Sequence, residues 1–233
     1  TKWEDLIKDP EVEIVDNGLP NNMHHDPCIM AAELGKHIIC EKPLARTAKE
    51  AEEMYRAAEK AGIKHMTAFN YRFVPAIRLA KQLIDEGYIG KILQFRGVYL
   101  QEWIMDPNFP LVWRLRKEIA GSGALGDLGS HVIDLIGYLL GEYRSIFAAL
   151  HTFIKRRPIA PGSSEYTEVR VDDLALLQAR MKSGAMGTIE AARVATGSND
   201  DLYLEIHGTE GAIRWSLMEP NWLYIYDARD PSV

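Results

Sequence analysis

A single predicted helix carries the side chains best suited to acid–base chemistry. Residues 127–140 are otherwise apolar or small, and at about 100° per residue their larger polar members fall on one stripe: Asp127, His131, Asp134 and Tyr138. Buried carboxylates and imidazoles are costly unless they are paired or hydrogen-bonded. The stripe therefore indicates either a satisfied polar network, with Asp127 as helix N-cap and His131 as a core histidine, or the wall of a site. Spacing alone does not favour one over the other.

A second candidate follows a predicted buried strand. Glu41, Lys42 and Pro43 come directly after the apolar residues 37–40. Charged residues at the carboxyl end of a parallel strand lie at the edge where α/β folds bind ligands. A lysine there can donate or accept a proton if burial lowers its pKa. By position alone, a surface ion pair at a strand end is the more common explanation.

The glycine-rich residues 121–126, Gly-Ser-Gly-Ala-Leu-Gly, match the GxGxxG pattern of dinucleotide-binding loops. That fingerprint must follow a hydrophobic strand, and an acidic strand end must come about 20 residues later. Here residues 114–120 are mostly charged, and no such acidic strand end follows. We therefore reject this run as the nucleotide loop, and we expect its glycines to let backbone approach a ligand beside His131.

Several segments, taken together and in order, resemble the Gfo/Idh/MocA oxidoreductases. They are residues 20–24, 35–43, 70–75, 113–114, 121–134 and 205–211. Each is modest alone, but together they extend over most of the chain. The resemblance implies an NAD(P)-dependent oxidoreductase. Its reaction would move a hydride between nicotinamide C4 and a hydroxyl-bearing carbon of a sugar, glycoside or inositol-like polyol.

The resemblance implies a catalytic role for three residues. In that family the lysine of the Glu-Lys-Pro motif lies between nicotinamide and substrate, which corresponds to Lys42. The family's aspartate and histidine, four apart on a helix, line the substrate site and correspond to Asp127 and His131. His131 would be the general base, assisted by Lys42, and Asp127 would orient His131 or bind a hydroxyl. The cofactor carries the redox chemistry, while the protein supplies position and proton transfer.

The resemblance also implies the binding residues. Contacts to NAD or NADP are expected from Pro20, Asn21, His24, Glu41 and Lys42. Contacts to the substrate are expected from Arg72, Trp113, Arg114, Asp127 and His131. A polar, aromatic-lined pocket suits a polyhydroxylated ring, whose C–H faces stack on tryptophan and whose hydroxyls need donors and acceptors. No metal is expected among these residues.

Two other functions would use the same residues. One is the NAD-dependent glycosidase found in this family, which cleaves a glycosidic bond through transient oxidation. Release of nitrophenol from a nitrophenyl glycoside without net NADH production would distinguish it. The other is a non-catalytic, sugar-sensing regulator with the same fold. The joint presence of Lys42, Asp127 and His131 argues against that regulator.

Alternating strands and helices must position the first candidates, a pattern typical of a parallel α/β sheet. We expect strands over residues 11–15, 37–40 and 65–69, and helices over residues 26–34, 47–61 and 76–86. Asp26 before Pro27 predicts an N-cap followed by proline at the first helical position. Thr47 and Glu50 form a predicted capping box.

The second half of the chain changes character. Strands are expected over residues 92–100, 174–181, 187–194, 203–207, 212–217 and 223–226, covered by the helix at 127–140. The predicted fold is therefore α/β plus α+β. A truncated Rossmann-type sheet would cover residues 1–72, and a substrate-binding and oligomerisation domain with a large open antiparallel sheet would cover residues 73–233. In the resembled family that sheet packs against a partner subunit, which implies a homodimer or homotetramer.

Two departures from the family pattern affect cofactor binding. The strand, GxGxxG turn and second strand that usually open the fold do not precede Thr1. We therefore expect the chain to be an interior piece of the enzyme that binds NAD(P) weakly and is inactive alone. Residues 17–19, Asn-Gly-Leu, also replace the run that is usual before Pro20, which bears on the local cofactor contacts.

Composition argues against several other classes of protein. The 233 residues are 47% apolar and 26% charged with a net charge of −6, which fits a globular protein without the basic stripe of a nucleic-acid binder. The basic residues 155–157 are expected to form a solvated loop, and no apolar run is long enough to span a membrane. Cys28 and Cys40 form no CxxC pair and suit buried positions in a reducing compartment, so a cytoplasmic enzyme is expected.

Overall fold

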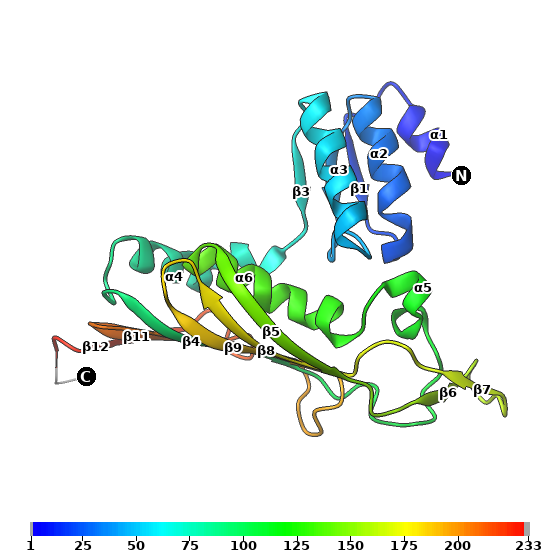
Figure 1. Cartoon of the computed structure of the whole chain (residues 1–233). Coiled ribbons are helices and arrows are strands. Elements are labelled where there is room, and N and C mark those ends of the chain that lie inside the picture. The colour runs from blue at the N-terminus through cyan, green and yellow to red at the C-terminus, as the bar shows by residue number, and fades with distance from the viewer. Residues whose placement is uncertain (1, 231–233) are drawn as a thin grey trace.

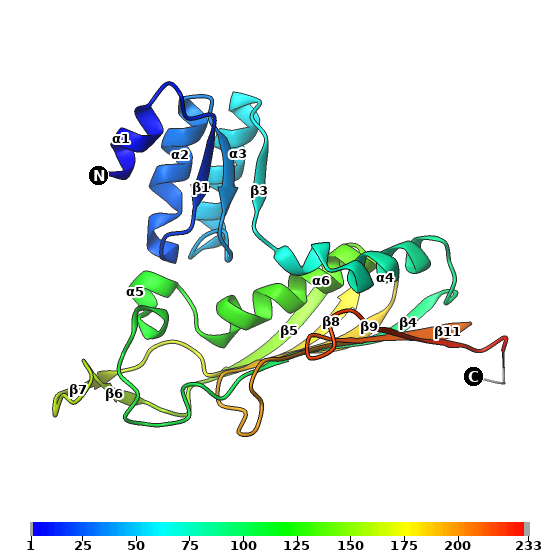
Figure 2. The ribbon, with the colours of Figure 1, turned by 180° about the vertical axis from the view of Figure 1, so that it is seen from behind.

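Two sheets organise the chain in a computed structural model that describes residues 2–230 (Figure 1). Sheet A is parallel, in the order β1 (Ile14–Asn17), β2 (His37–Cys40) and β3 (His65–Thr67). One face of it is covered by α2 (His25–Glu33) and α3 (Ala48–Ala61), which lie behind the strands in Figure 2, and α1 (Trp3–Lys8) packs against α2. The Rossmann-type parallel unit predicted for this half is confirmed.

The core of sheet A arises from alternation along its strands. Val15, Ile38 and Cys40 point toward the helices and are buried, whereas their neighbours on β1 and β2 are more exposed. Cys28 of α2 is also buried, and neither cysteine is in a disulfide. Both cysteines therefore occupy the buried positions expected from the sequence.

β1 and α2 begin at residues other than those predicted, and β3 ends at Thr67 rather than at residue 69. β1 begins at Ile14 rather than at residue 11, because Asp9 starts a turn in which its carbonyl accepts from the backbone N–H of Val12. The prediction of Asp26 as an N-cap is wrong, since α2 begins at His25. The short helix η1 (Asn21–Met23) runs into α2 through His24, whose backbone is already helical, so Asp26 falls within the first turn.

Sheet B is the larger sheet, with seven strands. Their order is β12 (Leu223–Asp227), β11 (Gly211–Ser216), β10 (Asp201–Gly208), β4 (Ile92–Leu100), β9 (Met186–Ala192), β8 (Leu174–Met181) and β5 (Tyr143–His151). The sheet is mixed rather than wholly antiparallel, because β4 pairs parallel with β9. β4 lies between β9 and β10, which run in opposite directions, so it must be parallel to one of them.

Helices α4 (Pro75–Asp85) and α6 (Ser130–Leu140) cover one face of sheet B (Figure 1). Leu135 and Ile136 of α6 pack into the same core as Phe95 and Trp215 of the sheet. The helix predicted over residues 127–140 begins with a π-helical turn, η4 (Leu125–Gly129). Sheet A is joined to α4 by η2 (Asn70–Phe73), so the predicted boundary between residues 72 and 73 falls inside this short helix.

Residues 155–157 do not form the solvated loop predicted for them. They lead into a hairpin of β6 (Arg156–Pro158) and β7 (Tyr166–Glu168), and the side chain of Arg157 is fully buried. Its guanidinium donates to the carbonyl of Asp106 at 2.8 Å, of Phe109 at 3.3 Å and also of Ile104. The planar, five-donor guanidinium thus binds backbone carbonyls of the loop at residues 104–109, and sequence spacing does not reveal this.

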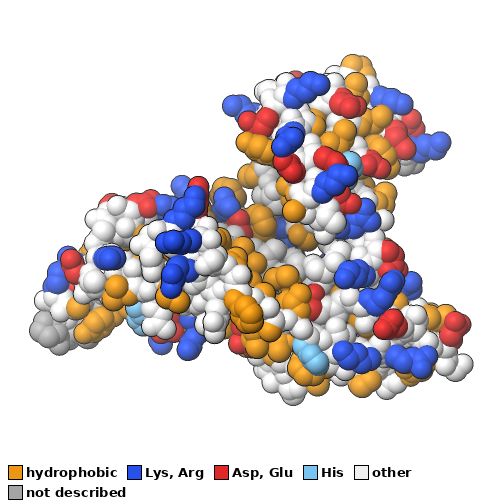
Figure 3. Space-filling view, viewed as in Figure 1, with side chains coloured by type: hydrophobic (Ala, Val, Ile, Leu, Met, Phe, Trp, Pro, Cys, Tyr) orange, Lys and Arg blue, Asp and Glu red, His pale blue; other side chains and the backbone are white. Residues whose placement is uncertain are grey.

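The surface mixes both signs of charge. On the face shown in Figure 3, Lys and Arg side chains are interspersed with Asp and Glu over both units. Across residues 2–230 no helix is both long and apolar enough to cross a membrane.

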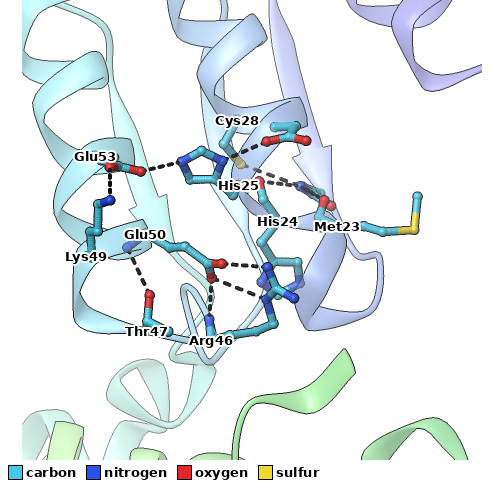
Figure 4. A network of polar contacts seen from close by, with 11 residues as sticks. Met23, His24, His25, Cys28, Arg46, Thr47, Lys49, Glu50 and Glu53 are labelled. Carbon is cyan, nitrogen blue, oxygen red and sulfur yellow. Dashed lines mark hydrogen bonds and ion pairs between the residues drawn. The ribbon is translucent and has the colours of Figure 1, made fainter. Parts of the chain in front are cut away.

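A polar network joins α2 to α3 (Figure 4). Thr47 Oγ1 accepts from the backbone N–H of Glu50 at 3.1 Å, as the predicted capping box requires. The Glu50 carboxylate reaches the backbone N–H of Arg46, also at 3.1 Å, rather than that of Thr47. Nearby, His25 Nδ1 lies 2.7 Å from the carboxylate of Asp26, and Nε2 lies 3.0 Å from that of Glu53.

This network predicts a pH-dependent contribution of His25 to stability. Burial alone would lower the pKa of His25, but the hydrogen bonds and charges of Asp26 and Glu53 raise it above its ordinary value. The stabilisation is therefore full below about pH 6.5 and is lost as pH rises through the folded-state pKa. In thermal melts, His25→Gln should lower Tm clearly at about pH 5.5 and much less at about pH 8.5. An equal loss at both values would contradict the proposed charge pairing.

Candidate active site

Two cavities flank one ion pair where the two units meet. Each has a volume of about 320 Å³, and Lys42, Arg114 and Asp127 line both. The first lies against the loops that follow β1 and β2, and its other lining residues are Gly18, Leu19, Asn21, Glu41, Pro43, Trp113, Ala120, Ser122 and Arg193. The second lies against β4 and α6, and its other lining residues are Tyr99, Gln101, Trp103, Leu128 and His131. The first cavity thus occupies the usual ligand edge of a parallel sheet.

Lys42 reaches from the sheet A unit to Asp127 of the other unit. Its Nζ donates to the carbonyl oxygen of Asp127 at 2.7 Å and to Oδ1 at 3.1 Å. Lys42 follows β2 directly, and Asp127 lies in η4. The two side chains are 18% and 19% exposed, so little water weakens their attraction.

Arg193 is a site residue that the sequence patterns do not reveal. Its side chain is 1% exposed, and its Nε lies 3.4 Å from Asp127 Oδ2. Burial alone would raise the pKa of Asp127, but the charges of Arg193 and Lys42 outweigh burial and lower it. Asp127 is therefore a carboxylate at neutral pH, with a cation beside each oxygen. The one signal in the sequence is a charged residue within the apolar strand predicted over residues 187–194.

The imidazole of His131 lies among aromatic rings. Its centroid is 4.7 Å from that of Tyr71, 5.9 Å from that of Tyr99 and 6.0 Å from that of Phe69. Its Nδ1 is buried and has no hydrogen-bond partner among residues 2–230. Packing, rather than a hydrogen bond to Nδ1, therefore orients this ring.

His131 is neutral over the physiological pH range. Burial, followed by the positive charge of Lys42, lowers the pKa of His131 to about 3 against the opposing effect of Asp127. A neutral imidazole keeps one unprotonated nitrogen and can accept a proton. The structure brings Lys42, Asp127 and His131 to the lining of one cavity, which is the arrangement that general acid–base chemistry requires.

The polar stripe of the predicted helix divides into two groups. Asp127 and His131 line the second cavity, whereas Asp134 pairs with Arg72, whose Nε donates to Oδ2 at 2.7 Å. The guanidinium of Arg72 also lies 5.4 Å from the ring centroid of Tyr138. Within the described part of the chain, Arg72 is not among the residues that line either cavity. The structure therefore does not bring this predicted substrate residue to the site.

The predicted cofactor residues are also divided. Asn21 and Glu41 line the first cavity, and Asn21 Nδ2 donates to the carbonyl of Ala120 at 2.9 Å. Pro20 immediately precedes η1, the short helix that begins with Asn21. His24 is fully buried; its Nε2 lies 2.8 Å from the Leu19 carbonyl, and its Nδ1 also contacts backbone carbonyls. His24 therefore supports the loop instead of lining the cavity.

Aromatic and cationic side chains complete both cavities. Arg114 stacks on Trp113, with its guanidinium carbon 4.4 Å from the ring centroid, in the short helix η3 (Trp113–Leu115). Both residues line the first cavity, and Arg114 also lines the second. Gln101 and Trp103 of the second cavity follow β4 directly and belong to no motif in the sequence. Their position after a strand was the only available signal.

The glycine-rich turn packs against protein rather than against a ligand. It follows α5 (Lys117–Ala120), a helix rather than a strand, which supports its rejection as a nucleotide loop. A Cβ on Gly123 would lie 1.8 Å from the carbonyl oxygen of Asp172, and one on Gly121 would lie 2.8 Å from the Arg46 side chain. The expectation that these glycines admit a ligand is therefore wrong. The Asp172 carboxylate instead accepts from the N–H of Gly123 and of Leu125, both at 2.7 Å, and so holds the turn that leads to Asp127.

Comparison with known proteins agrees with this geometry. Levoglucosan dehydrogenase of Pseudarthrobacter phenanthrenivorans is 48% identical over 98% of this chain and 61% of its own length. A solved structure of levoglucosan dehydrogenase in complex with NADH and levoglucosan has a TM-score of 0.95 at 49% identity, and the match covers 99% of this chain and 61% of that one. An oxidoreductase domain protein from Kribbella flavida has a TM-score of 0.95 at 44% identity, covering 100% of this chain and 62% of that one.

Two family domains match the chain in succession. Residues 1–69 match the oxidoreductase family with an NAD-binding Rossmann fold, and residues 77–214 match the GFO/IDH/MocA C-terminal domain. These matches, together with the meeting of the two units at Lys42 and Asp127, show that the chain belongs to the Gfo/Idh/MocA oxidoreductase family.

Proposed function

We propose that this chain provides the reaction centre of an NAD(P)-dependent sugar or polyol dehydrogenase. The observation that carries the proposal is the pair of cavities that share the Lys42–Asp127 ion pair, with His131 lining one of them. A dehydrogenase of this kind needs two adjoining sites, because the carbon that gives up a hydride must meet the group that accepts it. The chain spans 61% of the length of levoglucosan dehydrogenase, and that relative supports the same activity here.

The first cavity fits a nicotinamide. It lies at the carboxyl edge of sheet A, and the backbone at Gly18 is open, with no atom within 4 Å of where a Cβ would lie. Gly18, Asn21 and Glu41 would hold one side of the ring, and Lys42 would adjoin it. When bound, the cofactor supplies the hydride acceptor in oxidation. NADH in the solved levoglucosan dehydrogenase supports this assignment.

The second cavity fits a hydroxylated ring. Trp103 offers an apolar face for ring C–H groups, while Gln101 and Arg114 offer polar groups for hydroxyls. The named ligand of the solved relative, levoglucosan, is a compact sugar of this kind. We infer that the substrate is a sugar or polyol of similar size.

Three residues of the protein would share proton transfer and charge stabilisation. The neutral imidazole of His131 would accept the hydroxyl proton as the carbon gives up its hydride to the cofactor, so that the C–OH group becomes a carbonyl. Lys42 donates a hydrogen bond to that oxygen and stabilises the negative charge that develops on it. The Asp127 carboxylate keeps the Lys42 ammonium at the boundary between the two cavities. Aromatic packing around His131 excludes water from the proton transfer.

We also propose that the enzyme is a homo-oligomer that associates through sheet B. The face away from α4 and α6 is uncovered in Figures 1 and 2. It carries exposed large apolar side chains, namely Phe147, Leu176, Met186, Tyr224 and Tyr226. Phe147, which is 72% exposed, is costly to leave in water and supports a covered face.

Substitution of the two acid–base residues tests the proposed function. In the full-length enzyme with NAD+ or NADP+ and a panel including levoglucosan and inositols, His131→Ala and Lys42→Ala should each lower kcat by roughly 10²-fold or more. Their Tm should change far less. The exposed surface variants His65→Ala and Lys49→Ala are matched controls and should keep full activity. Full activity in both site variants, or no turnover of any member of the panel by the unmodified full-length enzyme, would refute the proposal.

Light scattering tests the oligomer. The unmodified protein should elute as a dimer or tetramer, and Phe147→Asp should shift it toward the monomer because a buried unpaired charge is costly. Leu34→Asp, an equally drastic change at the exposed end of α2 outside sheet B, should leave the mass unchanged. A monomeric unmodified protein at micromolar concentration would contradict association through this face.

A further inference from the structure

Arg193 combines complete burial with few hydrogen bonds of its own. It follows β9 directly, and its Nη1 donates to the carbonyl of Arg114 at 3.3 Å. Its Nε is buried without a hydrogen-bond partner among residues 2–230, although Asp127 Oδ2 lies 3.4 Å away. A buried guanidinium in this state depends on its counter-ion. For Arg193 the nearest counter-ion is Asp127.

The other buried arginine shows what a purely structural role looks like. The Nε of Arg157, like that of Arg193, has no partner among the described residues, but Arg157 donates to three loop carbonyls and is not among the residues lining either of the two cavities. The neighbours of Arg193 instead line the cavities: Asp127, the backbone of Arg114, and Trp103, whose ring centroid lies 5.8 Å from the guanidinium carbon. Arg193 itself lines the first cavity. Each of these contacts fixes a part of the site.

We propose that Arg193 is a positioning residue that holds the Asp127 carboxylate on Lys42 and ties Arg114 and Trp103 of the substrate cavity to the same point. This inference rests on the function proposed above. It assigns Arg193 no direct contact with the reacting atoms. Its effect passes through Asp127 to Lys42, and through Arg114 and Trp103 to the bound ring.

Charge supports the first half of this role. The charged and titratable groups that face Asp127 are Lys42 from the loop after β2, Arg114 from η3, His131 from α6, and Arg193. Burial opposes ionisation of Asp127, and Arg193 and Lys42 together overcome it, so its pKa is lowered. Without Arg193 the burial remains but one cation is gone. Asp127 would then take up a proton at higher pH and lose its charge attraction for Lys42.

Two variants separate the charge of Arg193 from its shape. Arg193→Gln removes the charge, and the acid limb of the pH profile of kcat should move to higher pH by about 1 unit or more. Arg193→Lys restores the charge but not the planar fork, so the acid limb should return toward its original position. KM for the sugar should be higher than in the unmodified enzyme in both variants, because neither glutamine nor lysine can hold the Arg114 carbonyl and the Trp103 ring together. An unmoved acid limb in Arg193→Gln, or an unchanged KM in Arg193→Lys, would overturn the proposal.

A second measurement does not depend on activity. Carbon-13 NMR of aspartate carboxyls gives the titration of Asp127, identified by the signal missing in Asp127→Asn. Its midpoint should rise in Arg193→Gln and return in Arg193→Lys. An unchanged midpoint in a variant that melts like the unmodified protein would overturn the charge role. If Arg193→Gln does not fold, the KM of Arg193→Lys decides. If the unmodified full-length enzyme turns over no sugar, the proposed function fails, while the NMR result still tests the link between Arg193 and Asp127.

Discussion

The burial of one carboxylate between two cations is the constraint on which the site depends. Asp127 receives Lys42 from the end of β2 on one oxygen, and Arg193 from the end of β9 lies beside the other. One cation comes from each sheet, so the carboxylate can be satisfied only when the two units meet in this arrangement. Removing either cation would leave a buried charge partly uncompensated. The same contact therefore sets the relation of the two units and places Lys42 between the two cavities.

Short backbone contacts reinforce this junction. Asn21, after β1, donates to the Ala120 carbonyl, and Arg46, after β2, donates to that of Glu118 at 2.8 Å. Both segments of the sheet A unit therefore bind the backbone around α5. Close approach at Gly121 and Gly123, where no side chain fits, lets that segment lie flat against Arg46 and Asp172. His131 is held differently, by aromatic packing that keeps it neutral. The site thus combines a charged centre with a neutral imidazole that lies among aromatic rings.

Local patterns predicted most of the fold but not the contacts that assemble the site. Helices and strands with clear periodicity follow from short-range chemistry, whereas the choice of Lys42, Asp127 and His131 needed the resemblance to the family, because position and spacing left structural explanations open. Helical spacing alone did not distinguish Asp134 from Asp127, because their different partners, Arg72 and Lys42, come from distant segments. The sequence analysis did not identify Arg193 as a site residue for the same reason, since its counter-ion, Asp127, is far away in sequence. The position of β4 between β9 and β10 is likewise a long-range choice that no local alternation encodes.

In the proposed function, a hydride passes directly between a ring carbon and the nicotinamide where the two cavities adjoin at Lys42. The most direct test uses a sugar or polyol with deuterium on its ring carbons, together with NAD+ or NADP+ and the full-length enzyme. Mass spectrometry of the recovered cofactor should find a single deuterium in the reduced nicotinamide and a matching carbonyl in the sugar. Reduced cofactor that carries only solvent hydrogen, formed while the deuterated sugar is consumed, would contradict the account.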